Sequence, residues 1–354
     1  MINKKLNLYL FLPALVFLAL PFFSTGCSSV RDSGVFKSQD WGDSWEQKTV
    51  ISKKQSIALS EVAALVSDPA DSKILYLGTR GEGLYKTMDG GDIWYHLDDT
   101  NLALNNRANV YDIAIDPKNS SQLYIGTYQD RLGRVFRSAD AGRSWEEVYR
   151  VSRERYAIFA VEVDPINSAV IYVGTAEGGL LKSLDFGKSW RVVKWFEDVI
   201  SDIKVNPQNN QIVFVSTNDK GIFRTNDQGE TWQSLDGVKL FPLEMTKIET
   251  LVMDWQNPDI LYSGSQKGLL KSVDAGQFWE RLNIVIPPSA VPILAVAQDP
   301  INPDRLYYAA GNVVYRTFDR GQTWSVQPLP TTKKIKVLTI DPRSAGIIYA
   351  GIGK

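Results

Sequence analysis

Apolar and polar residues alternate in short segments along most of the chain. The segments Ile113–Pro117 (Ile-Ala-Ile-Asp-Pro) and Leu123–Thr127 (Leu-Tyr-Ile-Gly-Thr) form one pair, and Val161–Pro165 with Ile171–Thr175 form another. A period of two, bounded by Pro, Gly or Asn, is typical of short antiparallel strands. The Asp-Pro or Asn-Pro turn after the first strand occurs seven times, beginning at Asp68, Asp116, Asp164, Asn206, Asn257, Asp299 and Asp341. No helical period appears beyond the N-terminal segment, so the fold class is predicted to be all-β.

A second motif, Ser/Thr-x-Asp-x-Gly-x-x-Trp, recurs about every 46 residues, which is a spacing typical of repeat folds. Its Asp and Trp residues are Asp40, Asp89, Asp140, Asp185, Asp227, Asp274 and Asp319, and Trp45, Trp94, Trp145, Trp190, Trp232, Trp279 and Trp324. The Asp can accept hydrogen bonds from turn N–H groups, Gly permits positive φ, and Trp can pack between sheets. We therefore interpret these residues as structural and not catalytic.

The two motifs together predict a four-stranded antiparallel unit. Strand A ends at the Asp-Pro turn, B carries Tyr-x-Gly, C enters the second motif and D starts at its Trp. The first motif copy, at Ser38, has no A and B strands before it, and the last turn, at Asp341, has no motif after it. Joining Leu338–Gly351 with Gly34–Val50 would complete one unit and remove exposed sheet edges. We predict a seven-bladed β-propeller over 34–354, with the last blade closed by strands from both termini.

The first 26 residues have the layout of a secretory signal. Lys4 and Lys5 precede an uncharged apolar run, Leu6–Phe23, and Ser24-Thr25-Gly26 stands directly before Cys27, the only cysteine. This order resembles a bacterial lipoprotein signal, which implies that Cys27 is lipidated after cleavage and that 27–33 is a short tether. A plain signal peptide and an uncleaved anchor are the alternatives. The expected location is extracytoplasmic, with a lipid anchor in a bacterial membrane on its periplasmic or cell-surface side.

Composition excludes several kinds of site. With one His and one Cys, the chain has no residues for a zinc site, a Cys–His dyad or a disulfide framework, so neither a metal nor a cofactor is expected. The 39 basic and 40 acidic residues give a net charge of -1, which does not favour nucleic acid as a partner.

At this point the second motif can be identified as the Asp-box, and the repeats resemble the BNR/Asp-box superfamily over nearly all of 34–354. A single ring behind a lipoprotein signal is similar to the photosystem II stability/assembly factor family. The repeat motifs Tyr-x-Gly-Thr and Gly-Leu-x-Lys-Ser-x-Asp are more similar to the repeats of sortilin-type receptors and of xyloglucan-cleaving hydrolases. Sialidases also contain the Asp-box. The hydrolases have two propellers, sortilin-type receptors have ten blades, and no Arg-Ile-Pro of sialidases occurs here. No catalytic residue is carried over from these families.

Because the A–B turns and the boxes share one face of the ring and are uniform, a specific site is expected on the opposite face, which carries the B–C and D–A loops. We call these the uniform face and the variable face. Six arginines are expected in one sector of the variable face, as a site for a protein partner or an anionic glycan: Arg80, Arg107, Arg131, Arg134, Arg153 and Arg155. The alternative is that these arginines are solvated and paired with neighbouring acids such as Asp130 and Glu154.

Trp195 is a further partner-binding candidate, because exposed aromatics beside acids can stack on sugars or anchor a protein. The alternative is that Trp195 and Phe196 pack beneath their loop. A glycosidase would need a pair of carboxylates, for which Glu177, Asp198, Asp219 and Glu244 are candidates without a distinctive spacing. His96 is interpreted as incidental.

Three functions follow from these observations. The first is a non-catalytic, membrane-tethered propeller that acts as a protein-binding scaffold or assembly factor. The second is a glycan-binding protein or glycoside hydrolase at the cell surface, and the third is a structural surface protein without a specific ligand. Whether the protein is an enzyme stays open. A non-catalytic role is favoured, and a glycoside hydrolase is the expected class if it is an enzyme.

Overall fold

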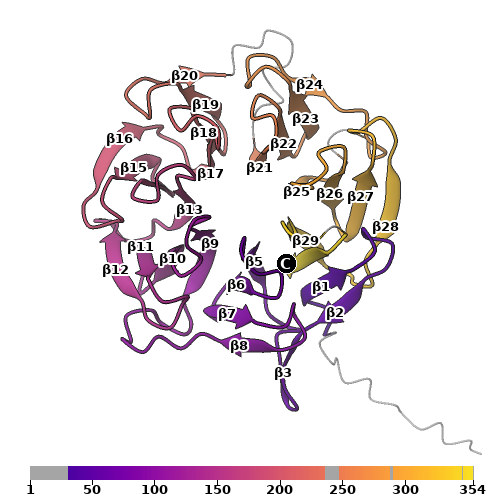
Figure 1. Ribbon diagram of the computed structural model, residues 1–354, viewed down its shortest axis with the longest axis horizontal. Coiled ribbons are helices and arrows are strands. Elements are labelled where there is room, and N and C mark those ends of the chain that lie inside the picture. Colours follow the sequence, from indigo (N-terminus) through magenta and orange to yellow (C-terminus); the bar gives the residue numbers. More distant parts are fainter. Residues whose placement is uncertain (1–30, 236–246, 288–289, 345, 354) are drawn as a thin grey trace, which may run out of the picture. The chain divides into compact units, whose positions relative to one another are not determined.

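The computed structural model describes residues 31–235, 247–287, 290–344 and 346–353. Within them, seven four-stranded antiparallel sheets are arranged as blades around a centre (Figure 1). This arrangement confirms the predicted all-β, seven-bladed propeller. No helix long and apolar enough to cross a membrane occurs in this described part of the chain. The predicted signal segment and Cys27 lie outside the described residues, and both stay predictions.

The blades follow one another along the chain, each ordered A, B, C, D. Blade 1 has β5 (Val62–Ser67), β6 (Leu75–Thr79), β7 (Leu84–Thr87) and β8 (Trp94–His96). Blade 2 has β9 (Asn109–Ile115), β10 (Leu123–Gln129), β11 (Leu132–Ser138) and β12 (Glu146–Arg150). Blade 3 has β13 (Ile158–Val163), β14 (Ile171–Thr175), β15 (Gly179–Ser183) and β16 (Arg191–Trp195).

The remaining blades repeat this order. Blade 4 has β17 (Ile200–Val205), β18 (Val213–Thr217), β19 (Gly221–Thr225) and β20 (Gln233–Ser234). Blade 5 has β21 (Ile248–Met253), β22 (Leu261–Ser265), β23 (Gly268–Ser272) and β24 (Glu280–Arg281). Blade 6 has β25 (Ile293–Gln298), β26 (Leu306–Ala310), β27 (Val313–Thr317) and β28 (Ser325–Pro328).

Blade 7 is built from both ends of the chain, as predicted. Its A and B strands are β29 (Lys334–Ile340) and β30 (Ile348–Gly353), and its C and D strands are β1 (Gly34–Ser38) and β2 (Glu46–Lys48). β1 pairs with β30 from Gly34 opposite Ile352 to Ser38 opposite Ile348. The buried Asp32 adds a second connection, because its carboxylate accepts hydrogen bonds from the Thr332 N–H (2.8 Å) and hydroxyl (2.9 Å).

One element was not predicted. A short hairpin, β3 (Val50–Ser52) and β4 (Gln55–Ser56), stands between blade 7 and blade 1 and projects outward from the ring (Figure 1). The structure also corrects one turn. In blade 5 the buried turn residue is Asp254, whose carboxylate accepts a hydrogen bond from the Gln256 N–H (2.8 Å), and the predicted Asn257-Pro258 comes three residues later.

Every Asp-box forms the turn expected from its sequence. In the first box the Ser38 hydroxyl donates to Asp40 (2.8 Å) and accepts from the Gly42 N–H (2.7 Å), while the Ser44 N–H (2.9 Å) and hydroxyl (2.6 Å) donate to the same carboxylate. The hydroxyl hydrogen bonds lower the pKa of four box carboxylates to about 2, those of Asp40, Asp185, Asp227 and Asp319. Each carboxylate is therefore used within its turn.

The box Trp side chains pack between neighbouring blades, also as predicted. Trp94, Trp145 and Trp279 are fully buried. Trp145, for example, lies in an apolar cluster with Tyr76 and Leu84 of the preceding blade. The core is thus divided into separate clusters between adjacent sheets, because each sheet is apolar on both faces.

The Tyr and Gly that recur in strand B connect neighbouring blades at several junctions. The Tyr76 hydroxyl of blade 1 donates to the carbonyl of Ala141 in the box of blade 2 (3.2 Å), and Lys86 Nζ donates to the same oxygen (3.2 Å). Tyr124, Tyr172 and Tyr349 make the equivalent bond at three other junctions. Gly78 permits close approach of the next A strand, since a Cβ there would lie 2.7 Å from the Val110 carbonyl oxygen.

Candidate functional site

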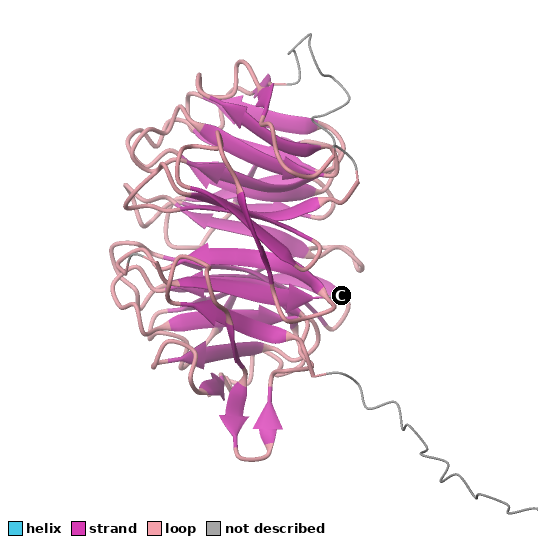
Figure 2. Ribbon diagram, turned by 90° about the vertical axis from the view of Figure 1, so that its right-hand side faces the viewer, coloured by secondary structure: helices cyan, strands magenta, loops and turns pink. Residues whose placement is uncertain are grey.

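The uniform face is occupied by contacts that hold the ring together. Besides the Tyr and Lys bonds to the boxes, the turn Asp of one blade accepts a hydrogen bond from a Ser in the next blade's turn, as between Asp68 and Ser120 (2.6 Å) or Asp116 and Ser168 (2.9 Å). Strands run between this face and the variable face, with loops at both (Figure 2). The polar groups of the uniform face are therefore largely committed to structure.

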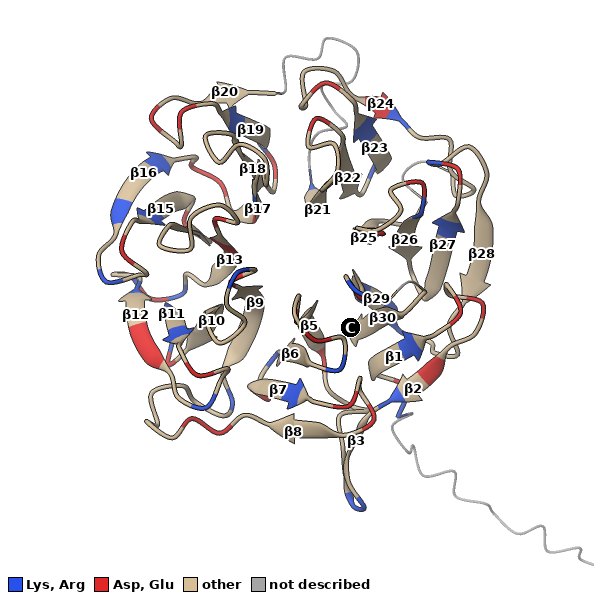
Figure 3. Ribbon diagram, in the orientation of Figure 1, with Lys and Arg blue, Asp and Glu red and all other residues tan. Residues whose placement is uncertain are grey.

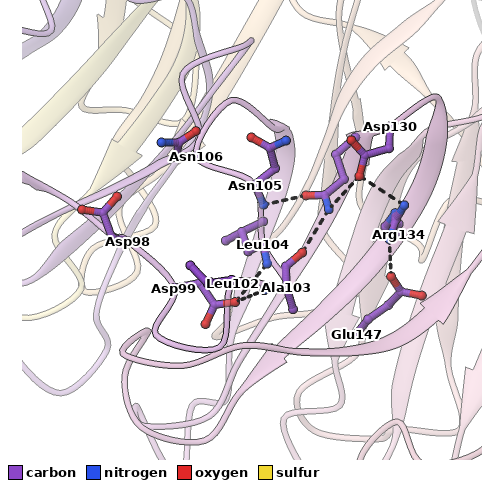
Figure 4. Close-up of a pocket in the computed structure, with 11 residues that line it drawn as sticks. Asp98, Asp99, Leu102, Ala103, Leu104, Asn105, Asn106, Asp130, Arg134 and Glu147 are labelled. Carbon is purple, nitrogen blue, oxygen red and sulfur yellow. Dashed lines mark hydrogen bonds and ion pairs between the residues drawn. The ribbon is translucent and has the colours of Figure 1, made fainter.

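A groove of about 560 Å³ lies beside the D–A loop that joins β8 to β9. Its walls come from this loop and from blade 2 (Figure 4). They are formed by residues 98, 99, 102–106, 129, 130, 134 and 147. The groove was not predicted as a site, although Arg134 and Asp130 had been placed in this sector.

The loop along the groove is held by a buried carboxylate. Asp99 accepts hydrogen bonds from the N–H groups of Asn101 (2.9 Å), Ala103 (2.7 Å) and Leu104 (2.9 Å), and from Trp145 of blade 2 (3.0 Å). An ionised acceptor strengthens such bonds. Asp99 thus fixes the loop to the neighbouring blade and is not available to a ligand.

Gln129, at the end of β10, fixes the loop from the other side. Its side-chain oxygen accepts from the Asn105 N–H (2.9 Å), and its amide nitrogen donates to the Ala103 carbonyl (3.0 Å). The loop therefore has a defined backbone despite its irregular sequence.

Ion pairs cover the inner wall of the groove. Arg134 donates to Glu147 (2.6 Å) and to Asp130 (3.3 Å), and Glu147 also pairs with Arg150 (2.8 Å). Arg134 Nε is buried without a hydrogen-bond partner in the structure. Asp98, at the opposite end of the groove, contacts His96 Nδ1 (2.8 Å).

The six predicted arginines do lie in one sector, over blades 1 to 3, where acidic residues are interleaved with them (Figure 3). Four are paired: Arg80 with Glu61 (3.4 Å), Arg131 with Glu154 (2.7 Å), Arg134 as above, and Arg153 with Glu177 (3.2 Å). Arg107 and Arg155 are exposed, and neither forms an ion pair with a residue in the described ranges. Their predicted role in binding an anionic partner stays a prediction.

Trp195 and Phe196 differ in environment. Phe196 is buried and packs edge-on against Trp232 (centroids 5.3 Å apart). Trp195, at the end of β16, is about half exposed, and its ring lies over Gly179, where a Cβ would come within 3.0 Å. Trp195 is therefore accessible to a partner, whereas Phe196 belongs to the core.

The four candidate carboxylates have other uses or no description. Glu177 pairs with Arg153, and Asp198 accepts from the N–H groups of Asp219 (2.6 Å) and Lys220 (2.9 Å). Asp219 accepts from the Asn218 amide (2.7 Å), and Glu244 lies outside the described residues. The structure thus gives no carboxylate pair among them that is free of such bonds.

Sequence reasoning missed a charged cluster on the innermost strands, formed by Asp112, Glu162, Asp202 and Lys204. Lys204 Nζ pairs with Asp202 (2.7 Å), and Asp112 and Asp202 each accept an N–H from the next A strand, at Val161 (2.8 Å) and Leu251 (3.1 Å). Glu162 and Lys204 stand two residues before the turn, where blades 1 and 6 have Val66 and Ala297. These charged residues at a repeat position that is apolar in blades 1 and 6 could have indicated the cluster from the sequence.

Burial dominates the electrostatics of this cluster. It raises the pKa of Glu162 to about 7 and that of Asp112 to about 6. Burial alone would favour the neutral amine of Lys204, yet the Asp202 and Glu162 carboxylates raise its pKa. A cavity of about 100 Å³ adjoins the cluster and is partly covered by the exposed Trp255.

Two remaining residues have structural contacts. His96 also contacts the Glu82 carbonyl through Nε2 (3.2 Å) and stacks edge-on with Tyr85. Trp41 packs against Gly346 in its own blade and lies beneath Arg305 of blade 6. Among the described residues, no group of three or more His, Cys, Asp or Glu is positioned to hold a metal ion.

Comparison with known families gave one match. The family model for Photosynthesis system II assembly factor YCF48 matches residues 190–346, just under half of the chain. This range runs from the box Trp of blade 3 to the A–B turn of blade 7. A search of curated protein sequences found no match.

Solved structures share the fold at low identity. The GH74 xyloglucanase from Xanthomonas campestris is 18% identical, with a TM-score of 0.69 over 83% of this chain and 51% of that enzyme. The chain thus spans about half the length of the xyloglucanase. YCF48 bound to a D1 peptide is 14% identical, with a TM-score of 0.61, and the match covers 83% of this chain and 94% of that chain. YCF48 from Cyanidioschyzon merolae is 12% identical, with a TM-score of 0.62, and the match covers 82% of this chain and 95% of that chain.

The two kinds of neighbour differ in how much of them is matched. The match covers 94% of the solved YCF48 chain but only 51% of the xyloglucanase chain. The chain is a single seven-bladed Asp-box propeller that resembles the photosystem II assembly factor family in its second half.

Proposed function

We propose that the chain is a non-catalytic, membrane-tethered extracytoplasmic propeller that binds a protein partner through its variable face, as a scaffold or assembly factor does. The observation that carries the proposal is the division between the faces. The polar groups of the uniform face hold blades together, whereas a groove reaches the variable face at Gln129, Asp130 and Arg134. Arg107, Arg155 and Trp195 are accessible on the variable face. A similar-sized neighbour, YCF48, has been solved with a D1 peptide bound.

Partner binding is tested by site-specific photo-crosslinking in the native host. A crosslinker at Arg155 or Trp195 on the variable face is expected to capture a discrete partner, and the same group at the exposed Leu184 in a box of the uniform face is the matched control. Equal products from both faces, or none from the variable face, would contradict the proposal. The double variant Arg107→Glu, Arg155→Glu is expected to reduce the captured product, while Lys188→Glu on the uniform face leaves it unchanged.

The tether is tested separately. Cys27 stands five residues before the buried Asp32, so a lipid on Cys27 would hold the ring within about 17 Å of the membrane at full chain extension. Mass spectrometry of the mature N-terminus is expected to find an acylated Cys27, and Cys27→Ala is expected to move the protein to the soluble fraction. An unmodified Cys27, or a mature chain that begins elsewhere, would contradict the anchor.

A glycan-active role is the second candidate, favoured by the likeness to the GH74 propeller. It predicts binding on a glycan array or release of reducing sugar from xyloglucan. The candidate carboxylates are engaged by Arg153, by backbone N–H groups and by Asn218, so we expect no hydrolysis. Turnover that is lost in Glu177→Gln would establish this second function instead.

A further inference from the structure

Leu102 is the most exposed large apolar side chain of the described residues, at 89%. It stands at the tip of the loop along the groove, and its backbone has φ = 57°. A left-handed conformation is unfavourable for a residue with a branched side chain. Both exposure and backbone conformation thus need support from the surrounding loop.

The support is extensive. Asp99 accepts three N–H groups on either side of Leu102, and Gln129 binds the following segment through Ala103 and Asn105. The Trp145 N–H ties Asp99 to blade 2. A strained residue that its surroundings fix in place is a reason to suspect a functional surface. Because the loop already holds Leu102 in one conformation, less conformational entropy is lost when a partner binds to it.

Unequal charge flanks the leucine. Asp98 and Asp130 stand at opposite ends of the groove (Figure 4), with side chains 81% and 57% exposed. Arg134 is only 15% exposed and is engaged by Glu147 and Asp130. Four carboxylates and one guanidinium line the groove, and the two most exposed of these charged groups are the carboxylates of Asp98 and Asp130, which favours a cationic occupant.

We propose that this groove docks a basic, extended peptide segment of a protein partner, whose Lys or Arg side chains face Asp98 and Asp130 and whose apolar side chain covers Leu102. The inference rests on the proposed protein-binding function and names the chemistry of the one partner segment that enters the groove. Arg107 and Arg155 do not line the groove and are left to an acidic part of the same partner, whereas the most accessible charges of the groove itself are carboxylates.

The lining favours a peptide over a glycan. No aromatic ring is among the residues that line the groove, so it has no platform on which a sugar could stack. Its amide side chains, Asn105 and Asn106, can pair with a peptide backbone at the rim.

The test uses the full mature protein and a library of short synthetic peptides, in which net charge varies from acidic to basic with and without leucine or phenylalanine. Fluorescence anisotropy is expected to show binding of basic peptides with an apolar residue, and weakening by added salt. The double variant Asp98→Asn, Asp130→Asn is expected to lose about tenfold in affinity, as is Leu102→Ser, since a few central side chains carry most of the binding energy. Leu184→Ser on the uniform face is the matched control.

Three outcomes overturn the inference: equal binding of acidic and basic peptides, the same loss in Leu184→Ser as in Leu102→Ser, or an oligosaccharide that competes for the groove. Thermal unfolding of each variant shows that a loss of binding is not a loss of fold. If the crosslinked partner is retained in Asp98→Asn, Asp130→Asn, the proposed function stands and this inference is wrong. If the native protein captures no partner but basic peptides bind, the peptide chemistry of the groove stands and the proposed function is wrong.

Discussion

The hydroxyl of Tyr349 in blade 7 donates a hydrogen bond to the carbonyl of Gly90 in the box of blade 1 (3.2 Å). Lys37 of blade 7 donates to the same oxygen (2.9 Å). The bond spans the junction where the ring closes, and it is the same bond that Tyr76 makes to Ala141. The strand-B tyrosine thus connects neighbouring blades at four junctions, made by Tyr76, Tyr124, Tyr172 and Tyr349.

We therefore predict that Tyr349→Phe lowers the free energy of unfolding by about 1 kcal/mol, the usual net contribution of one buried hydrogen bond. Urea denaturation monitored by tryptophan fluorescence measures the change. Tyr95→Phe, at an exposed position in β8, is the control and is expected to leave the midpoint unchanged. Equal midpoints for all three proteins would show that Lys37 alone satisfies the carbonyl.

Two boxes lack one hydroxyl donor. Ile93 and Phe278 stand where the other boxes have Ser or Thr, and in those two boxes the carboxylate receives the backbone N–H but no hydroxyl at that position. Ile93→Thr is predicted to stabilise the protein by about 0.5–1 kcal/mol, because Ile93 is partly exposed and the new hydroxyl can reach Asp89. The reverse change, Thr231→Val, is expected to destabilise by a similar amount. Thermal unfolding of both variants is the measurement, and a change of the same sign in both would contradict the explanation.

Glu162 makes stability depend on pH near neutrality. Its pKa is about 7 in the folded protein and 4.5 as a free side chain, so between these values the folded state holds a proton that the unfolded state has released. Stability from this group is therefore present below pH 4.5 and is lost as the pH rises through about 7. Glu162→Gln is predicted to reduce that slope and to leave the part that comes from Asp112, whose pKa burial raises to about 6. Unfolding free energies of both proteins at several pH values provide the check, and identical slopes would be inconsistent with a raised pKa.

The box carboxylates act in the opposite direction. The pKa of Asp40 is about 2 in the folded state against 3.8 for a free side chain, so its stabilising effect is present above pH 3.8 and is lost as the pH falls through about 2. Asp185, Asp227 and Asp319 share this sign. We predict that the protein takes up several protons when it unfolds in acid, and that the Asp40→Asn variant takes up fewer. Proton uptake is measured from the pH dependence of the unfolding midpoint. This pH dependence should be unchanged in Asp259→Asn, because Asp259 is exposed and lies outside the boxes.

Asp32 is predicted to be required for full closure of the ring. Its carboxylate accepts from the Thr332 N–H and hydroxyl and lies 3.2 Å from Lys333 Nζ, and the Thr332 N–H is the largest cause of its lowered pKa. Asp32→Ala is expected to cost about 1–3 kcal/mol, because the partners lose a charged acceptor. Hydrogen exchange should increase at Thr332 and along β1 and β30. Unaltered exchange in β1 would mean that strand pairing alone closes the blade.

The fold was predictable because each repeated residue acts locally and acts seven times. The Asp of a box binds its own turn, the Trp packs against an adjacent sheet, and the offset between turns and boxes leaves only one way to complete a ring. The error at Asn257 arose because Trp255 replaces the usual Pro after Asp254, so the sequence signal moved while the backbone turn did not.

The candidate site was predictable only in part. The sector of arginines was found, but ion pairs such as Arg153 with Glu177 join residues from different loops, and their partners could not be read from spacing. The groove depends on Asp99 of one blade junction accepting a hydrogen bond from the Trp145 N–H of blade 2, a contact that no repeated motif encodes. Such a contact follows from the folded arrangement and from no repeated pattern.

The pairing of β1 with β30 also has a consequence for when the protein can fold. Gly34 is among the first residues of the ring to be synthesised and Ile352 among the last, so their pairing must wait until the whole chain is available. Contacts so distant along the sequence form slowly, and the unpaired strand edges exposed meanwhile can bind to other chains. A protein exported unfolded would accordingly complete its seventh blade only on the far side of the membrane, after its last strand has arrived.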